Sequence, residues 1–164
     1  MAVLRRARLR DFRGHEHAQA DLGAGLTVLH GPNGAGKTNL LEALYFGCTG
    51  RSCRTAADRE LVRFDAQATR VELDVDTPDG AHRLAVGYER GGAKHLTADG
   101  APVERLLDVP FRPLIVVFLP DRLELVKGAP ADLIVVDLDQ PFIVDRAKLH
   151  SKARNSAFDE ARMQ

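Results

Sequence analysis

The segment Gly31-Pro-Asn-Gly-Ala-Gly-Lys-Thr38 constrains the fold of this chain more than any other feature of the sequence. It matches the phosphate-loop pattern G-x-x-x-x-G-K-[ST], in which glycines allow positive φ angles and a close approach of backbone N–H groups to a phosphate. Such a loop follows a strand and opens a helix, whose partial positive charge also faces the anion. The motif therefore predicts an α/β fold, with a strand before residue 31 and a helix from Lys37.

Each part of this loop has an expected role in nucleotide binding. Lys37 would place its ammonium group on the β- and γ-phosphates, and the Thr38 hydroxyl would ligate Mg²⁺. A dinucleotide site of Rossmann type is disfavoured because the glycines run G-x-x-G-x-G. An ordinary glycine-rich turn is the alternative that the pattern leaves open. The expected cofactors are ATP and Mg²⁺, with Thr38 as the metal ligand and with these cofactor-binding residues: Gly31, Pro32, Asn33, Gly34, Ala35, Gly36, Lys37 and Thr38.

Hydrophobic patterning supplies the strand and the helix that the loop requires. The run Leu26–His30 is almost entirely apolar, as in a buried parallel strand, and the residues after Lys37 have helical spacing as far as Gly47 or Gly50. Thr77–Gly80 joins two alternating runs and predicts a hairpin. The other predicted elements are a half-buried strand over 3–12, a third antiparallel strand over 94–97, a second buried strand over 114–118 and a helix over 121–126. The expected fold is α/β, a P-loop layer with a three-stranded antiparallel insertion.

Composition restricts the class of protein. With 164 residues, 45% hydrophobic and 28% charged, the chain can form one packed domain, or one domain and a fragment. The longest apolar run, Leu114–Leu119, is far shorter than the ~18 residues of a membrane helix, and no secretory signal is expected. Cys48 and Cys53 are too few for a disulfide framework and are expected to be reduced thiols. These features favour a cytoplasmic protein without a membrane partner.

Charge is balanced over the whole chain but not along it. The 23 basic and 23 acidic residues cancel, yet residues 1–63 hold ten Lys or Arg against six Asp or Glu. A basic leading third favours contact with phosphates, although solvated strand faces explain individual arginines equally well.

Several segments resemble the RecF family of SMC-like, ABC-type ATPases. The segment NGAGKTNLLEA at 33–43 resembles the family's phosphate loop, and LRDFR at 9–13 resembles its opening strand. Further matches are TGRSCRT at 49–55, DRELVR at 58–63 and VVFLPDRLELVKG at 116–128. These matches occur in the family's order, so residues 1–128 are expected to be the first half of an ABC- or SMC-like ATPase head.

The resemblance implies a function in DNA repair, DNA replication and the SOS response. Proteins of this family are expected to bind ATP, to form a homodimer around it, and to act with recombination mediator proteins at junctions of single- and double-stranded DNA. Arg13 corresponds to the family's arginine near the nucleotide and joins the expected cofactor-binding residues. The stretch after the first helix carries a basic cluster that would contact the DNA backbone or remain solvated: Arg51, Arg54, Arg59 and Arg63.

The resemblance to RecF stops near Gly128. Residues 129–164 resemble the C-terminal segment of dihydroorotase, none of whose metal ligands can be placed here, and they are expected to be an unrelated tail rather than an independent domain. Leu133–Asp137 imitates a Walker B strand, but Leu138 stands where the catalytic carboxylate should follow and no signature motif precedes it. Residues 133–136 are nevertheless expected to form a strand, with 148–164 as a loosely attached helix or coil.

The sequence therefore indicates the ATP-binding part of a RecF-like DNA-repair protein, shorter than its family and joined to a foreign tail. A small P-loop kinase or transferase is the alternative, although neither an arginine-bearing lid nor an acceptor pocket is recognisable. A third interpretation is a fusion fragment without function.

We predict that this chain alone binds ATP but hydrolyses it at a rate near background, because no residue is placed to orient the attacking water. A steady-state assay of phosphate release with ATP and Mg²⁺ measures this rate. A turnover of ~1 per second, the low end for efficient phosphoryl transfer, would contradict the prediction and restore Asp137 as a Walker B residue.

Overall fold

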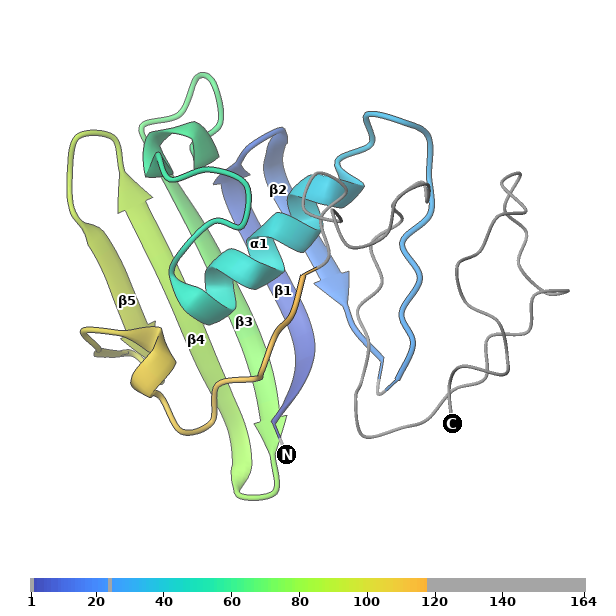
Figure 1. Cartoon of the computed structure of the whole chain (residues 1–164), viewed down its shortest axis with the longest axis vertical. Coiled ribbons are helices and arrows are strands. Elements are labelled where there is room, and N and C mark those ends of the chain that lie inside the picture. The colour runs from blue at the N-terminus through green and yellow to red at the C-terminus, as the bar shows by residue number, and fades with distance from the viewer. Residues whose placement is uncertain (1, 24, 118–164) are drawn as a thin grey trace, which may run out of the picture. The chain divides into compact units, whose positions relative to one another are not determined.

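An antiparallel sheet with one helix across one face forms the described part of the chain (Figure 1). The structure is a computed structural model that describes residues 2–23 and 25–117. The strand order is β2-β1-β3-β4-β5-β6, and every neighbouring pair is antiparallel. The elements are β1 (Val3–Phe12), β2 (His15–Asp21), α1 (Lys37–Thr49), η1 (Asp58–Leu61), β3 (Ala68–Thr77), β4 (Gly80–Glu89), β5 (Lys94–Ala98), β6 (Ala101–Pro102) and η2 (Leu106–Asp108), where η marks a 3₁₀ helix.

Strand β1 lies between β2 and β3. One of its faces is apolar and contacts the core, and the other carries charged side chains. Ala7, Leu9 and Phe12 are buried in the core. On the other face, Arg8 lies 2.8 Å from Asp74 of β3, and Arg83 of β4 lies 2.9 Å from the same carboxylate. Cross-strand ion pairs of this kind stabilise the pairing of neighbouring strands.

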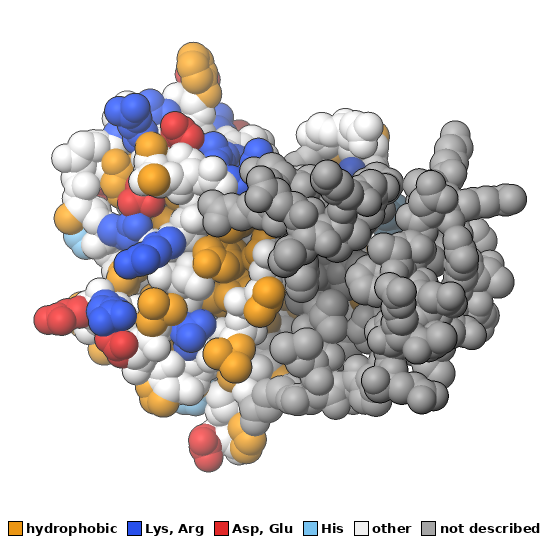
Figure 2. Space-filling model, in the orientation of Figure 1, with side chains coloured by type: hydrophobic (Ala, Val, Ile, Leu, Met, Phe, Trp, Pro, Cys, Tyr) orange, Lys and Arg blue, Asp and Glu red, His pale blue; other side chains and the backbone are white. Residues whose placement is uncertain are grey.

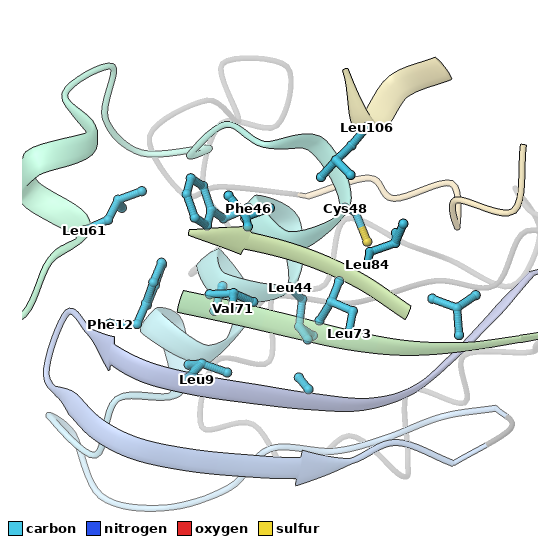
Figure 3. Close-up of a cluster of buried hydrophobic side chains, with 14 of the residues drawn as sticks. Leu9, Phe12, Leu44, Phe46, Cys48, Leu61, Val71, Leu73, Leu84 and Leu106 are labelled. Atoms are coloured by element: carbon cyan, nitrogen blue, oxygen red, sulfur yellow. The ribbon is translucent and has the colours of Figure 1, made fainter. Parts of the chain in front are cut away.

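The hydrophobic core lies between α1 and the sheet (Figure 3). The rings of Phe12 and Phe46 are 5.8 Å apart between centroids and tilted by 43°. Burial of each such side chain contributes about 1.5 to 3 kcal/mol, so the second half of α1 anchors the helix. The side chains labelled in Figure 3 are Leu9, Phe12, Leu44, Phe46, Cys48, Leu61, Val71, Leu73, Leu84 and Leu106.

The C-terminus of α1 is fixed by a left-handed glycine and a lysine. Gly50 has φ 71°, and its N–H donates to Phe46 O at 2.7 Å. Lys94 donates to Gly50 O at 2.6 Å and pairs with Asp58 at 2.8 Å. A glycine in this conformation and a cation beside the last carbonyls are the usual stabilisers of a helix C-terminus.

Much of the predicted secondary structure is confirmed. The strand over 3–12, the helix from Lys37, the hairpin through Thr77–Gly80 and the third antiparallel strand are all present as β1, α1, β3–β4 and β5. Gly50, rather than Gly47, ends the helix. Neither Cys48 nor Cys53 forms a disulfide, and burial raises the pKa of the Cys48 thiol to about 12.

The sequence predicted two buried strands, one before the phosphate loop and one after η2. Both predictions are wrong within the described residues. Residues 26–30 and 114–117 form neither helix nor strand, and Leu26, Val28 and Leu114 are 80%, 69% and 91% exposed. A parallel strand needs hydrogen bonds from neighbouring strands, and no described strand pairs with either run. The antiparallel strands predicted as an insertion therefore belong to one described sheet that includes β1.

Strand β2 is a further element that the sequence did not predict. Its residues are mostly polar, and only Ala18 and Ala20 supply a weak apolar alternation. The strand forms because its backbone pairs along β1 from Phe12 to Arg6. Here the pairing partner, rather than local propensity, determines the structure.

Several expectations lie outside the described residues. They are residue Phe118 of the second buried run, the helix over 121–126, the boundary at 128/129, the strand over 133–136 with Asp137, and the tail from 129 to 164. No helix of the described residues has the length and apolarity that crossing a membrane requires.

We predict that Gly47→Ala lowers the free energy of unfolding by about 1 to 2 kcal/mol, because overpacking outweighs the gain in helix propensity. A Cβ at Gly47 would lie 2.6 Å from Leu73 Cδ1 and 3.1 Å from Val71 Cγ1, both in the core. Urea unfolding measures the change. Gly14→Ala is the matched control, since its Cβ would lie 3.6 Å from the Asn39 side chain. An equal effect of the two substitutions would contradict the close approach of α1 to β3.

Candidate nucleotide site

The phosphate loop is an exposed turn that leads directly into α1. Gly34 and Gly36 each have φ 86°, a left-handed conformation that glycine adopts without strain. Ala35 N donates to Pro32 O at 3.2 Å, and Leu40 N donates to Gly36 O at 2.9 Å. These bonds close the loop and start the helical ladder, so the loop is already folded around its glycines.

The N-terminus of α1 keeps its backbone donors available. No side chain caps Gly36, and the first turn of the helix carries no acidic residue. Within the described residues, the backbone N–H groups of Lys37, Thr38 and Asn39 make no hydrogen bond. Free N–H groups at the positive end of a helix bind anions, and this arrangement fits a phosphate.

Lys37 lies folded over the loop. Its Nζ donates to Gly31 O at 2.9 Å and to Pro32 O at 3.0 Å, and no carboxylate among the described residues pairs with it. The ammonium charge is therefore uncompensated, and it fits a phosphate as a charge-assisted donor. Thr38 is exposed on the first turn, and the described residues contain no group of three His, Cys, Asp or Glu that could hold a metal ion.

Strand β2 supports the loop through His15. Its Nε2 lies 3.2 Å from Gly36 O, at the junction of loop and helix. A Cβ at Gly36 would lie 2.5 Å from His15 Cε1 and would displace the imidazole, and the φ angle of 86° also favours glycine here.

The carboxylate of Glu42, one helical turn after Thr38, joins three separate segments. The Glu42 side chain is fully buried and accepts two hydrogen bonds from Arg13, at 2.7 and 3.0 Å. It also accepts from Ser52 Oγ at 2.6 Å and from Arg54 Nη1 at 3.1 Å. The β1–β2 turn, α1 and the loop after α1 therefore meet at one acidic group.

Two opposing effects act on the pKa of Glu42. Burial raises the pKa, whereas hydrogen bonds from Arg13 and Ser52 and the charges of Arg13 and Arg54 lower it. The lowering effects are larger, so the pKa lies below its ordinary value of 4.5 and the group is charged at neutral pH.

Arg13 is held in an unusual backbone conformation at this junction. Its φ is 53°, its N–H donates to Leu61 O at 2.7 Å, and its Nη1 donates to Glu60 O at 2.9 Å. Positive φ is unfavourable for a residue with a side chain, and the contacts to Glu42 and η1 offset this cost. The structure thus places Arg13 against Glu42, and its predicted contact with the nucleotide stays a prediction.

The four arginines of the predicted basic cluster divide into two kinds. Arg54 is tied to Glu42 and to Asn39 Oδ1 at 3.2 Å, and Arg63 pairs with Asp11 at 2.7 Å. The side chains of Arg51 and Arg59 are exposed and make no ion pair or hydrogen bond within the described part of the chain. Only the second pair keeps its whole charge available for a ligand.

A family model described as an AAA domain matches residues 6–109, which include the loop, α1 and the sheet. The chain belongs to this AAA domain family. Within the family its N-terminal residues match RecF, as the sequence predicted. The DNA replication and repair protein RecF of Roseiflexus castenholzii is 41% identical over 141 residues, covering 76% of this chain and 36% of the relative. RecF of Anaeromyxobacter sp. is 48% identical over 123 residues, covering 74% of this chain and 33% of the relative.

Solved structures agree with the match to RecF. The recombination mediator protein RecF with ATP has a TM-score of 0.69 and 28% identity, covering 79% of this chain and 35% of that protein. An SMC ATPase has a TM-score of 0.60 at 19% identity, covering 65% of this chain and 76% of the other, which shows the fold alone. The chain spans about a third of the length of the RecF relatives that it matches. The predicted P-loop ATPase fold is thereby confirmed.

We predict that Glu42→Gln lowers the free energy of unfolding at pH 7 by about 3 kcal/mol, the lower end of the cost of breaking a buried ion pair. The lower end applies because the Arg13 and Arg54 side chains remain 20% and 41% exposed. The folded pKa of Glu42 is below 4.5, so its contribution is complete above that pH and is lost as pH falls through the folded pKa. The difference between the two proteins should therefore shrink below about pH 4.5.

Urea unfolding between neutral pH and pH 3 measures both effects. Asp74→Asn is the matched control, because Asp74 also holds two arginines but lies on the solvent face of the sheet. Its expected cost is below about 1 kcal/mol. Equal losses for the two variants would show that Glu42 has no special structural role.

Proposed function

We propose that this chain binds ATP with Mg²⁺ at the phosphate loop and functions in RecF-type DNA repair. The observation that carries the proposal is the folded loop, with free N–H groups at the N-terminus of α1 and the unpaired ammonium of Lys37 beside them. Its fold is shared with a RecF protein solved with ATP. The phosphates would lie against the N–H groups of Gly34, Gly36, Lys37 and Thr38. Lys37 would exchange a carbonyl for phosphate oxygens, and Thr38 would ligate Mg²⁺.

Arg13 would act beside this site while held by Glu42. The two residues form a bidentate pair one helical turn from Thr38, and the partly exposed Arg54 shares the same carboxylate. Two guanidinium groups around one carboxylate leave a net positive charge next to the loop. This charge favours a polyphosphate over a neutral ligand.

The further parts of the proposal follow from the RecF relatives, whose names state DNA replication and repair. They are an ATP-dependent homodimer, contact with the backbone of single- and double-stranded DNA at junctions, recombination mediator proteins as partners, a role in the SOS response, and a cytoplasmic location. Arg51 and Arg59 are the members of the basic cluster best suited to backbone phosphates, because no described carboxylate neutralises them.

We predict that Lys37→Ala weakens the binding of ATP·Mg²⁺ about 10- to 150-fold, the effect of losing a charge-assisted hydrogen bond worth about 1.5 to 3 kcal/mol. Isothermal titration calorimetry of the whole chain measures the affinity. Thr38→Ala should weaken ATP binding with Mg²⁺ present and change it little in EDTA. Arg105→Ala, which removes an exposed cation near η2, is the control and should bind as the unaltered chain does. Equal ATP affinity of the Lys37→Ala protein and the unaltered chain would reject the site.

A further inference from the structure

An exposed phenyl ring lies in the loop between η1 and β3. Phe64 is 89% exposed, and its loop stands at the top of Figure 1. Single apolar side chains on a surface are common, so the exposure alone indicates no ligand. The fixed shape of the loop and the charge around it are two independent observations that distinguish Phe64.

The loop that carries Phe64 is held at both ends by hydrogen bonds. Arg63 N donates to Asp11 O at 2.8 Å, and Arg63 Nε donates to the Asp11 carboxylate at 2.7 Å. On the other side, Arg90 Nη2 donates to Arg63 O at 3.1 Å and to Phe64 O at 3.2 Å. Arg90 N also donates to Gln67 O at 2.8 Å. The ring is therefore presented by a preorganised backbone, which reduces the entropic cost of binding.

Several cations lie near this loop, together with the carboxylates of Asp65 and Glu16, which act on Arg63. The Arg90 guanidinium binds two carbonyls and no described carboxylate, and Arg59 lies in η1, which leads into the loop. Figure 2 shows Lys and Arg side chains beneath the loop, with Asp or Glu side chains among them. Arg10 precedes Asp11, is exposed, and has no side-chain partner within residues 2–23 and 25–117.

The strand register extends this charge onto the open face of the sheet. Arg10 lies directly opposite Arg70 on one side and His17 on the other. Arg70 pairs with Glu72 at 2.8 Å and His17 lies 4.0 Å from Glu16, so Arg10 is the member of this row that a bound anion would neutralise. A groove of about 470 Å³ runs here, lined by Arg8, Arg10, Arg70 and His17 with Glu72 as its one carboxylate.

We propose that Phe64 and the arginines near it bind single-stranded nucleic acid. A base would stack on the Phe64 ring, and the backbone phosphates would contact Arg59 and Arg90 and continue past Arg10 into the groove. An aromatic platform beside a basic groove is the combination by which proteins hold unpaired strands without reading their sequence. The proposal rests on the proposed DNA-binding function and assigns it a surface.

Duplex DNA fits this surface less well than a single strand does. The bases of a duplex are already stacked on one another, so a phenyl ring on a short loop gains no contact with their faces. A protein partner would also cover an exposed aromatic side chain, but it would not require the guanidinium groups of Arg10 and Arg90, which no described carboxylate pairs with.

The test is a fluorescence anisotropy titration of a labelled oligothymidylate with the whole chain at several salt concentrations. Phe64→Ala should weaken binding of the single strand about 5- to 150-fold and leave the binding of a duplex of equal length unchanged. Arg10→Ala should weaken binding and reduce the slope of log affinity against log salt by about 0.7. ATP affinity, measured in parallel, should not change in either variant.

Leu107→Ala and Arg105→Ala are the matched controls, because they remove an exposed apolar side chain and an exposed cation near η2. Both should bind the oligonucleotide as the unaltered chain does. If Phe64→Ala and Arg10→Ala bind like these controls, the assigned surface is wrong although the DNA-binding function stands. If the unaltered chain binds neither single strand nor duplex, the DNA-binding function itself fails, and this surface with it.

Discussion

The ion pairs of the buried Glu42 carboxylate connect the β1–β2 turn, α1 and the loop after α1. The β1–β2 turn carries Arg13, the loop after α1 carries Ser52 and Arg54, and all three donate to the same two oxygens. A buried carboxylate without partners would be strongly destabilising, but here the hydrogen bonds and charges lower its pKa in spite of burial. The arrangement is therefore stable only when all three segments are in place. This makes the first turns of α1 a fixed reference for the loop before it.

The nucleotide loop depends on this fixed helix. The second half of α1 is anchored in the core through Phe46 and ends at Gly50 beneath Lys94. Its first turn, in contrast, has no side-chain cap and no acidic residue, so its N–H groups stay available. A helix that is capped at its C-terminus and open at its N-terminus is suited to hold an anion.

Local patterns predicted those elements whose structure is determined locally. The phosphate loop and α1 follow from glycine spacing and helical periodicity, and the β3–β4 hairpin follows from its turn. Residues 26–30 have the composition of a buried strand, but a strand also needs a neighbouring strand to hydrogen-bond with. That neighbour comes from a distant part of the chain, and no described strand pairs with residues 26–30. Strand β2 was missed for the same reason, since it is formed by pairing with β1. Glu42 gave no signal of its role, because only the fold brings Arg13 and Arg54 to it.

The central claim is that the preformed loop before α1 receives the phosphates of ATP. The most direct measurement is a titration of the ¹⁵N-labelled chain with ATP·Mg²⁺, followed by two-dimensional amide NMR. We expect the largest shifts at the backbone amides of Gly34, Gly36, Lys37 and Thr38. These shifts should saturate together with smaller shifts of the Arg13 and Arg54 side-chain Nε–H groups. Saturable shifts at other residues, with these loop amides unchanged, would contradict the claim.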